Sequence, residues 1–131
     1  MKSFLLGICF LLGSQLYAQD LSPAQAANAK NVRKYVSVQG KVISVKKWDE
    51  GKSLGFGDNF VFINMEEDYP YNPIVVRIPF KYMANFPDTE KLKEKRIRVK
   101  GKIVMSKYIN ETKRRPSIEL RNSSQLEILN D

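Results

Sequence analysis

The chain has 131 residues, which suits one domain, and its 22 lysines and arginines against 14 acidic residues give a net charge of +8. It has no histidine, and its one cysteine, Cys9, lies in the N-terminal segment that we expect to be removed, so the mature chain lacks the usual ligands of zinc and transition metals. Ser-His and Cys-His nucleophile pairs are excluded for the same reason. Only catalysis by carboxylates stays open, and the acids at 49–50 and 66–68 have the spacing of solvated turns. We therefore expect a protein that is not an enzyme, with no metal and no cofactor.

The first 18 residues have the organisation of a secretory signal peptide. Lys2 supplies the positive start, residues 4–12 are uncharged and mostly apolar, and Ala18 is a small residue suited to cleavage. The apolar run is shorter than the roughly 20 residues that a helix needs to span a bilayer. We predict cleavage after Ala18 and export, periplasmic or secreted, with no transmembrane span in the mature chain. Cleavage also removes Cys9, which suits an oxidising compartment. A buried N-terminal helix or an uncleaved anchor is the alternative.

A lead-in helix is predicted within residues 19–34. Ser22 is a good N-cap, Pro23 fits the first helical position, and Gln25 completes a capping box. Four alanines between 24 and 29 favour helix. Because large apolar residues are nearly absent from the segment, we expect it to lie against the domain rather than to form its core.

Most of the remaining chain alternates apolar and polar residues as half-buried strands do. Strands are predicted over residues 35–46, 59–65, 74–80 and 96–108, with a final strand formed by 117–120 and 125–129. A helical turn over 81–86, stopped by Pro87, separates the third strand from the fourth. Five strands with a helix in this place follow the order of the oligonucleotide/oligosaccharide-binding (OB) barrel. We predict an all-β fold with minor helix, a five-stranded OB-type Greek-key β-barrel over 35–131.

The alternation leaves two points of register open. In the first strand Val38, Gly40 and Val42 share one face, whereas Val45 has the opposite parity. Such a slip is what a bulge or bend produces, and Gly40 is the expected place for it. The second strand, 59–65, is apolar on both faces, so its alternation does not show which face is core.

Four short motifs together suggest a family. They are V-x-G-K-V-x-S-V at 38–45, F-x-F-x-N at 60–64, D-Y-P-x-N-P at 68–73 and R-V-x-G-K-I at 98–103. With them, the chain from about residue 32 to 129 resembles a family of small exported bacterial OB-fold domains, related to nucleic-acid-binding OB domains of the anticodon-binding type. The resemblance implies an OB barrel that binds nucleic acid. This chain departs from the family in a longer glycine-rich loop at 48–58 and a strongly basic one at 107–115. These loops frame the ligand groove of an OB fold.

Three groups of residues are candidates for ligand contact. Trp48 can offer a stacking platform, or can fold back to cap the barrel. The loop over 107–115 carries four cations and a tyrosine, which can grip phosphates and stack a base, or can form a solvated hairpin tip. The alternating cations between 96 and 102 can track a phosphate backbone, or can form an ordinary solvated face.

From these groups and the neighbouring strands we assign ten residues to a nucleic-acid or polyanion site. They are Lys46, Lys47, Trp48, Tyr71, Arg77, Lys107, Tyr108, Lys113, Arg114 and Arg115.

The predicted function is binding of single-stranded nucleic acid or another polyanion through a basic, aromatic-lined groove. Charge placement and the family resemblance favour it. The alternative is a module outside the cytoplasm that binds an envelope protein or a glycan and has no role with nucleic acid. The predicted export favours that alternative, because nucleic acid is a less obvious partner there.

Overall fold

The computed structural model describes residues 19–107 and 113–129. The predicted signal peptide over 1–18 and the candidate site residue Tyr108 lie outside the described residues. The strands are β1 (Tyr35–Trp48), β2 (Phe60–Met65), β3 (Val75–Pro79), β4 (Arg96–Lys102), β5 (Val104–Ser106), β6 (Arg115–Glu119) and β7 (Leu126–Ile128). The helix α2 (Pro23–Ala26) is joined by four 3₁₀ helices: η1 (Ala29–Asn31), η2 (Phe80–Asn85), η3 (Thr89–Leu92) and η4 (Ser123–Gln125).

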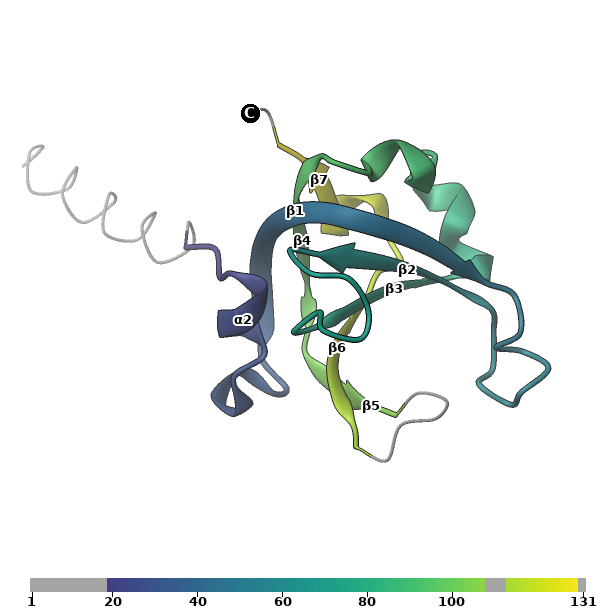
Figure 1. Cartoon of the computed structure of the whole chain (residues 1–131), viewed down its shortest axis with the longest axis horizontal. Coiled ribbons are helices and arrows are strands. Elements are labelled where there is room, and N and C mark those ends of the chain that lie inside the picture. The colour runs from purple at the N-terminus through teal and green to yellow at the C-terminus, as the bar shows by residue number, and fades with distance from the viewer. Residues whose placement is uncertain (1–18, 108–112, 130–131) are drawn as a thin grey trace, which may run out of the picture.

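β1 is the strand around which the sheet curves. Residues 35–41 pair antiparallel with β4, whereas residues 42–48 pair antiparallel with β2. The full order is β5-β6-β3-β2-β1-β4-β7, and β3 and β6 form the parallel pair in it. Figure 1 shows β1 arching over β2 and β3 and bending down towards α2. One strand therefore joins the part of the sheet that contains β2 to the part that contains β4.

The structure has seven strands where five were predicted, because two of the predicted strands are interrupted. The strand over 96–108 divides at Ile103, whose N–H donates to the Lys34 carbonyl (3.0 Å) while its carbonyl accepts from the Arg33 N–H (2.8 Å). The turn η4 separates β6 from β7. The prediction of an all-β fold with minor helix is confirmed. The described strands form one seven-stranded sheet, and the predicted five-stranded barrel is not confirmed.

The parity slip in β1 lies at Ile43, whereas the sequence predicted it at Gly40. The register with β2 shifts between Val42 and Ser44, which leaves Ile43 as the bulged residue. Gly40 is buried, and a Cβ there would lie 3.2 Å from the Pro23 ring. Gly40 therefore allows α2 to pack closely on β1, and the slip in register occurs at another residue.

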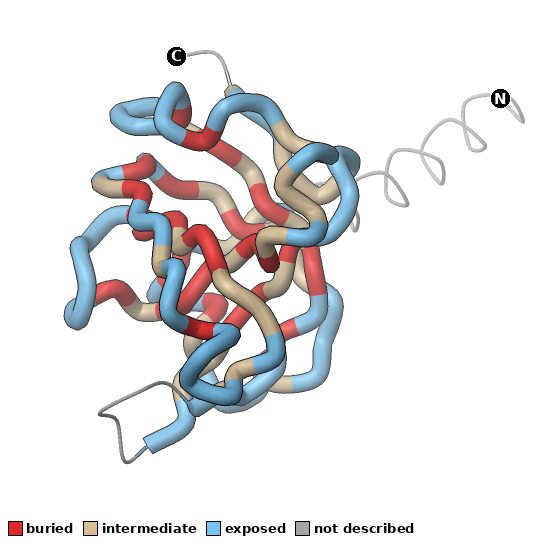
Figure 2. The backbone as a smooth tube through the Cα atoms, turned by 90° about the vertical axis from the view of Figure 1, so that its right-hand side faces the viewer, coloured by how far each residue is buried: buried red, intermediate tan, exposed pale blue. Residues whose placement is uncertain are grey.

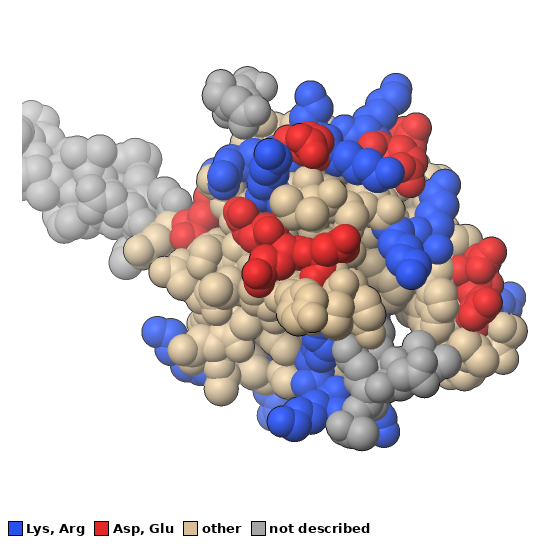
Figure 3. All heavy atoms as spheres, viewed as in Figure 1, with Lys and Arg blue, Asp and Glu red and all other residues tan. Residues whose placement is uncertain are grey.

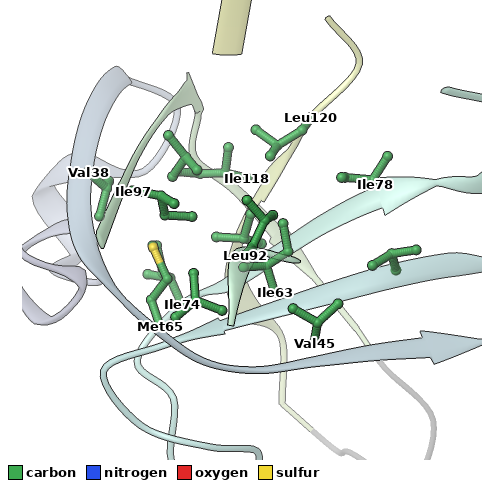
Figure 4. Packing of buried hydrophobic residues seen from close by; sticks show 14 of the residues in the cluster. Val38, Val45, Ile63, Met65, Ile74, Ile78, Leu92, Ile97, Ile118 and Leu120 are labelled. Atoms are coloured by element: carbon green, nitrogen blue, oxygen red, sulfur yellow. The ribbon is translucent and has the colours of Figure 1, made fainter. Parts of the chain in front are cut away.

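The core is aliphatic. Its largest fully buried side chains include Ile63, Ile78, Ile97, Ile118 and Leu120, and Figure 4 shows them pointing towards one another from β2, β3, β4 and the β6 region. Figure 2 shows the buried stretches of the chain gathered in the interior. Val61 and Ile63 of β2 point into this core, so Phe60 and Phe62 face outwards.

The lead-in segment packs as expected, but its helix is shorter. Ser22 and Gln25 form the predicted capping box, and Ala26 is fully buried. Leu21 forms a parallel bridge to Val38 of β1. In the described part of the chain, no helix is long and apolar enough to cross a membrane.

Asp20 ties the lead-in segment to the sheet. Its carboxylate pairs with the Arg98 guanidinium at 2.9 Å and accepts a hydrogen bond from the Ser37 hydroxyl at 2.6 Å. Arg98 also pairs with Glu127 at 2.8 Å. The hydrogen bond from Arg98, followed by that from Ser37, holds the pKa of Asp20 below its ordinary value.

The alternating cations of β4 share one outward face, as the sequence predicted. Arg96, Arg98, Lys100 and Lys102 all alternate with buried residues. Carboxylates bind Arg98, and Arg96 donates to the Gln39 side-chain oxygen at 3.3 Å. These two cations therefore hold β4 to its neighbours, which favours the structural interpretation of this group.

Replacing Asp20 with asparagine removes a charge and keeps the shape of the side chain. Because the folded-state pKa is depressed, the carboxylate contributes fully above its ordinary pKa of 3.8, and this contribution is lost as the pH falls through the lower folded value. We expect Asp20→Asn to unfold at lower urea than the wild type at pH 7. The difference between the two urea midpoints should shrink as the pH falls from the ordinary pKa of Asp20 through its lower folded value. A difference that does not change with pH would contradict the stabilising role of the Asp20 carboxylate.

Candidate binding face

Four aromatic rings pack together on the outer face of β1 and β2. The Trp48 ring lies 5.3 Å from that of Phe56 and 6.0 Å from that of Phe62, between centroids. Phe60 stacks beneath them, 6.4 Å from Trp48 and 6.1 Å from Phe62. Phe60 is only 5% exposed, while the other three rings are half-buried. We call these four residues the aromatic cluster.

The loop over 49–59 holds Trp48 in place. The Phe56 N–H donates to the Gly51 carbonyl at 2.9 Å, which folds the loop back on itself. Gly51 is buried, and a Cβ there would lie 2.3 Å from the Asp58 carbonyl oxygen and 3.2 Å from the indole. The glycine is therefore required by close packing, and the indole is both clamped and partly open to solvent.

A row of charged residues crosses the sheet next to the aromatic cluster. Lys46, Phe62, Arg77 and Glu119 are register partners on four neighbouring strands. The Arg77 guanidinium lies 4.8 Å from the Phe60 ring centroid and 3.2 Å from the Glu119 carboxylate. Arg77 is thus fixed between a ring and an acid, and Lys46 is the exposed cation of the row.

A polar network occupies the next part of the same face. The Ser44 hydroxyl donates to Asp68 at 2.6 Å, and the Asn64 amide donates to Ser44 at 2.9 Å. The Asn72 amide donates to the Asn64 side-chain oxygen at 3.2 Å. Arg115 donates to the Asn72 side-chain oxygen at 3.1 Å and to its backbone carbonyl. The network ties the β2–β3 connection to the start of β6.

The β2–β3 connection displays two tyrosines. Tyr71 is 77% exposed and Tyr69 is 53% exposed. The Arg115 guanidinium lies 5.7 Å from the Tyr69 ring centroid. The hydrogen bond from Ser44, followed by that from the Tyr69 N–H, holds the pKa of Asp68 below its ordinary value. Asp68 is therefore an anion that shapes this turn.

The structure brings three of the ten predicted site residues together on the outer face. Lys46 and Trp48 share the outward parity of β1, and Arg77 of β3 lies beside them. Lys47 has the opposite parity, because its register partner Val61 points into the core. Lys47 therefore does not join this group.

The other described site residues lie at the far end of the face. Tyr71 and Arg115 belong to the β2–β3 connection and the start of β6, and Arg115 is engaged by the polar network. Three more cations are exposed at the two ends of the β5–β6 connection: Lys107, Lys113 and Arg114.

The two ends of this face are about 20 Å apart when measured along the strands. Trp48 is level with Pro79 across the strands. Arg115 lies two residues before Ser117, which is level with Val75. Six residues of strand at about 3.3 Å each give this separation. Arg115 also lies three strands away from Trp48 across the sheet, so the rings and the basic end lie at opposite corners of this part of the sheet.

The sequence assignment missed several residues of this face. Phe56, Phe60 and Phe62 complete the aromatic cluster, and Glu119 offsets the charge of Arg77. The alternation of Phe60 and Phe62 was a usable signal, but the other face of β2 is equally apolar. Nothing in the sequence indicates that Glu119 lies beside Arg77, because this contact depends on the parallel pairing of β3 and β6.

Charge is unevenly distributed over the surface. Figure 3 shows acidic side chains gathered near the β2–β3 connection, with lysines and arginines above and below them. Within 19–107 and 113–129, no group of three potential acidic or thiol ligands is placed to hold a metal ion.

Comparison with known proteins gives limited likenesses. No protein-family model matches the chain, and no curated protein matches it in sequence. A crystal structure of a protein described as an aspartyl-tRNA synthetase from Leishmania major aligns with a TM-score of 0.49 and 8% identity, over 86% of this chain and 21% of that one. A crystal structure of a protein described as a nucleic acid-binding lipoprotein from Klebsiella pneumoniae aligns with a TM-score of 0.46 and 14% identity, over 82% of this chain and 79% of that one. The chain spans about a fifth of the first of these proteins.

Gly51→Ala tests the clamp on Trp48. The new methyl group collides with the Asp58 carbonyl and meets the indole, so the loop must shift. We expect a loss of about 1–3 kcal/mol in unfolding free energy, the usual cost of overpacking, and a red shift of tryptophan emission. The exposed Lys52→Ala is the control and should change neither quantity. Unchanged emission in the glycine variant would show that the loop does not hold the ring.

Proposed function

We propose that this protein binds single-stranded nucleic acid, or a polyanion of similar chemistry, on the outer face of β1, β2, β3 and β6. The observation that carries the proposal is the row of Lys46, Phe62 and Arg77 beside Trp48. Rings and cations alternate there within one surface, and both are needed to hold a chain of bases and phosphates.

The aromatic cluster supplies stacking surface. Trp48 and Phe62 are half-buried, so each keeps part of its ring open to solvent. Their undersides rest on Phe60, which fixes their orientation before a ligand arrives. A base stacked on such a ring contributes about 1–3 kcal/mol, with little preference among bases.

The basic end of the face supplies phosphate contacts. Lys113 and Arg114 are exposed where the chain enters β6, and Lys107 is exposed where it leaves β5. Arg115 is already engaged by Asn72, so we assign it to shaping the site and not to holding phosphate. The net charge of +8 adds a general attraction for polyanions.

Oligonucleotide titration with tryptophan emission as the signal tests the proposal, because Trp48 is the only tryptophan in the chain. We expect quenching by a stacked base, and affinity that falls steeply with salt. A single strand releases about 0.7 counterion per neutralised phosphate. Lys113→Ala/Arg114→Ala should therefore reduce the slope of log K against log salt by about 1.4.

The matched control is Lys100→Ala/Lys102→Ala, which removes the same charge from the outward face of β4. It should leave the slope unchanged. Binding without salt dependence, or an equal effect of the two double variants, would count against this face.

A second function is favoured by one observation. The Glu119 carboxylate neutralises the charge of Arg77 at the centre of the face. A neutral glycan can stack on aromatic rings without any charged partner, so it also fits such a surface. If oligonucleotides do not bind and a glycan or an envelope protein quenches Trp48 instead, this alternative holds.

We further propose that the protein acts outside the cytoplasm as an OB-type domain. When β4 is counted with β5, and β6 with β7, five strands remain with η2 and η3 between the third and the fourth. N-terminal sequencing of the protein recovered from its native cells should begin at Gln19. An intact Met1 at the N-terminus would contradict the predicted cleavage.

A further inference from the structure

A second cluster of cations around a ring lies beyond the C-terminal ends of β3 and β6. Lys81 Nζ is 5.3 Å from the Tyr82 ring centroid, and the Arg121 guanidinium is 5.6 Å from the same centroid. Tyr82 is half-buried and packs against the core, whereas both cations are exposed. We call Lys81, Tyr82 and Arg121 the Tyr82 cluster.

The Tyr82 cluster is continuous with the aromatic cluster through contacts across the strands. Phe60 contacts Arg77, which pairs with Glu119 at 3.2 Å. Glu119 pairs with Arg121 at 2.7 Å, and Arg121 reaches Tyr82. No gap interrupts this line of side chains from β2 to η2.

The line runs at right angles to the strands. Trp48 is level with Pro79. Glu119 is level with Arg77, so Arg121, two residues further along, is level with Pro79 as well. Three strand spacings of about 4.8 Å separate β1 from β6, which places Trp48 and Arg121 about 14 Å apart.

The chemistry of Arg121 suits a phosphate. Its side chain is 59% exposed, and its partner Glu119 is also held by Arg77. Arg121 can therefore turn to a phosphate without leaving that carboxylate unpaired. Lys81, which lies beside the same Tyr82 ring, can contact the neighbouring phosphate of the strand.

We propose that the Tyr82 cluster is a phosphate subsite, and that a bound single strand crosses the β-strands from Trp48 to Arg121. This inference rests on the proposed function. It assigns three residues beyond the ten identified from the sequence, and it places the bound strand across β1, β2, β3 and β6 rather than only along them towards Arg114.

Lys81→Gln/Arg121→Gln tests the subsite in the same Trp48 titration with a single-stranded oligothymidine. Removing two phosphate contacts should reduce the slope of log K against log salt by about 1.4, while quenching at saturation persists because the aromatic cluster is intact. Lys100→Gln/Lys102→Gln is the matched control and should leave the slope as in the wild type.

Lys81→Gln alone guards against a folding defect, because Lys81 is exposed. It should reduce the slope by about 0.7. One outcome would overturn the subsite but leave the proposed function standing. In it, the Lys81 and Arg121 variants keep the wild-type slope, whereas Lys113→Ala/Arg114→Ala has a smaller slope. The bound oligonucleotide would then run along the β-strands and not across them. If the wild type binds no oligothymidine, the proposed function itself fails.

Discussion

The candidate face depends on the single bulged residue in β1. Before Ile43, the even-numbered residues Val38 and Val42 point into the core. Without a slip, that parity would send Lys46 and Trp48 inwards, because a shift of one residue exchanges the two faces of a strand. The bulge turns Val45 inwards instead and leaves Lys46 and Trp48 on the outer surface. The outward positions of Lys46 and Trp48 follow from this exchange.

A second constraint is the composition of the core. The buried cluster consists of valine, isoleucine, leucine, methionine and alanine, and none of its fully enclosed members is aromatic. The interior is filled without the phenylalanines of β2, so Phe60 and Phe62 pack on the outside with Trp48. The ring cluster therefore lies on the outer side of the sheet, where the half-buried rings keep part of their surface open to solvent.

The distribution of charge is the third factor. Several cations are already matched by acids: Arg98 by Asp20 and Glu127, and Arg77 by Glu119. Half-buried arginines of this kind position strands, since their guanidinium groups bind carboxylates in fixed geometry. Apart from Lys46, the exposed cations assigned to this face lie at its margins, at the entrance to β6 and around Tyr82. The centre of the face is therefore less positive than the net charge of the whole chain suggests.

The sequence by itself determined the elements that depend on near neighbours. The capping box at Ser22, the positions of the strands, the parity slip in β1 and the outward cations of β4 all come from spacing along the chain. It also shows that the described chain cannot form a Ser-His or Cys-His pair, because the sequence has no histidine.

Only the tertiary structure decided which face of β2 is core, that Lys47 points away from the site, and that Glu119 meets Arg77. It also decided that Arg121 and Tyr82 extend the line of side chains that begins at Trp48. The physical reason is that these contacts join strands distant in sequence, and alternation within one strand carries no information about its partner.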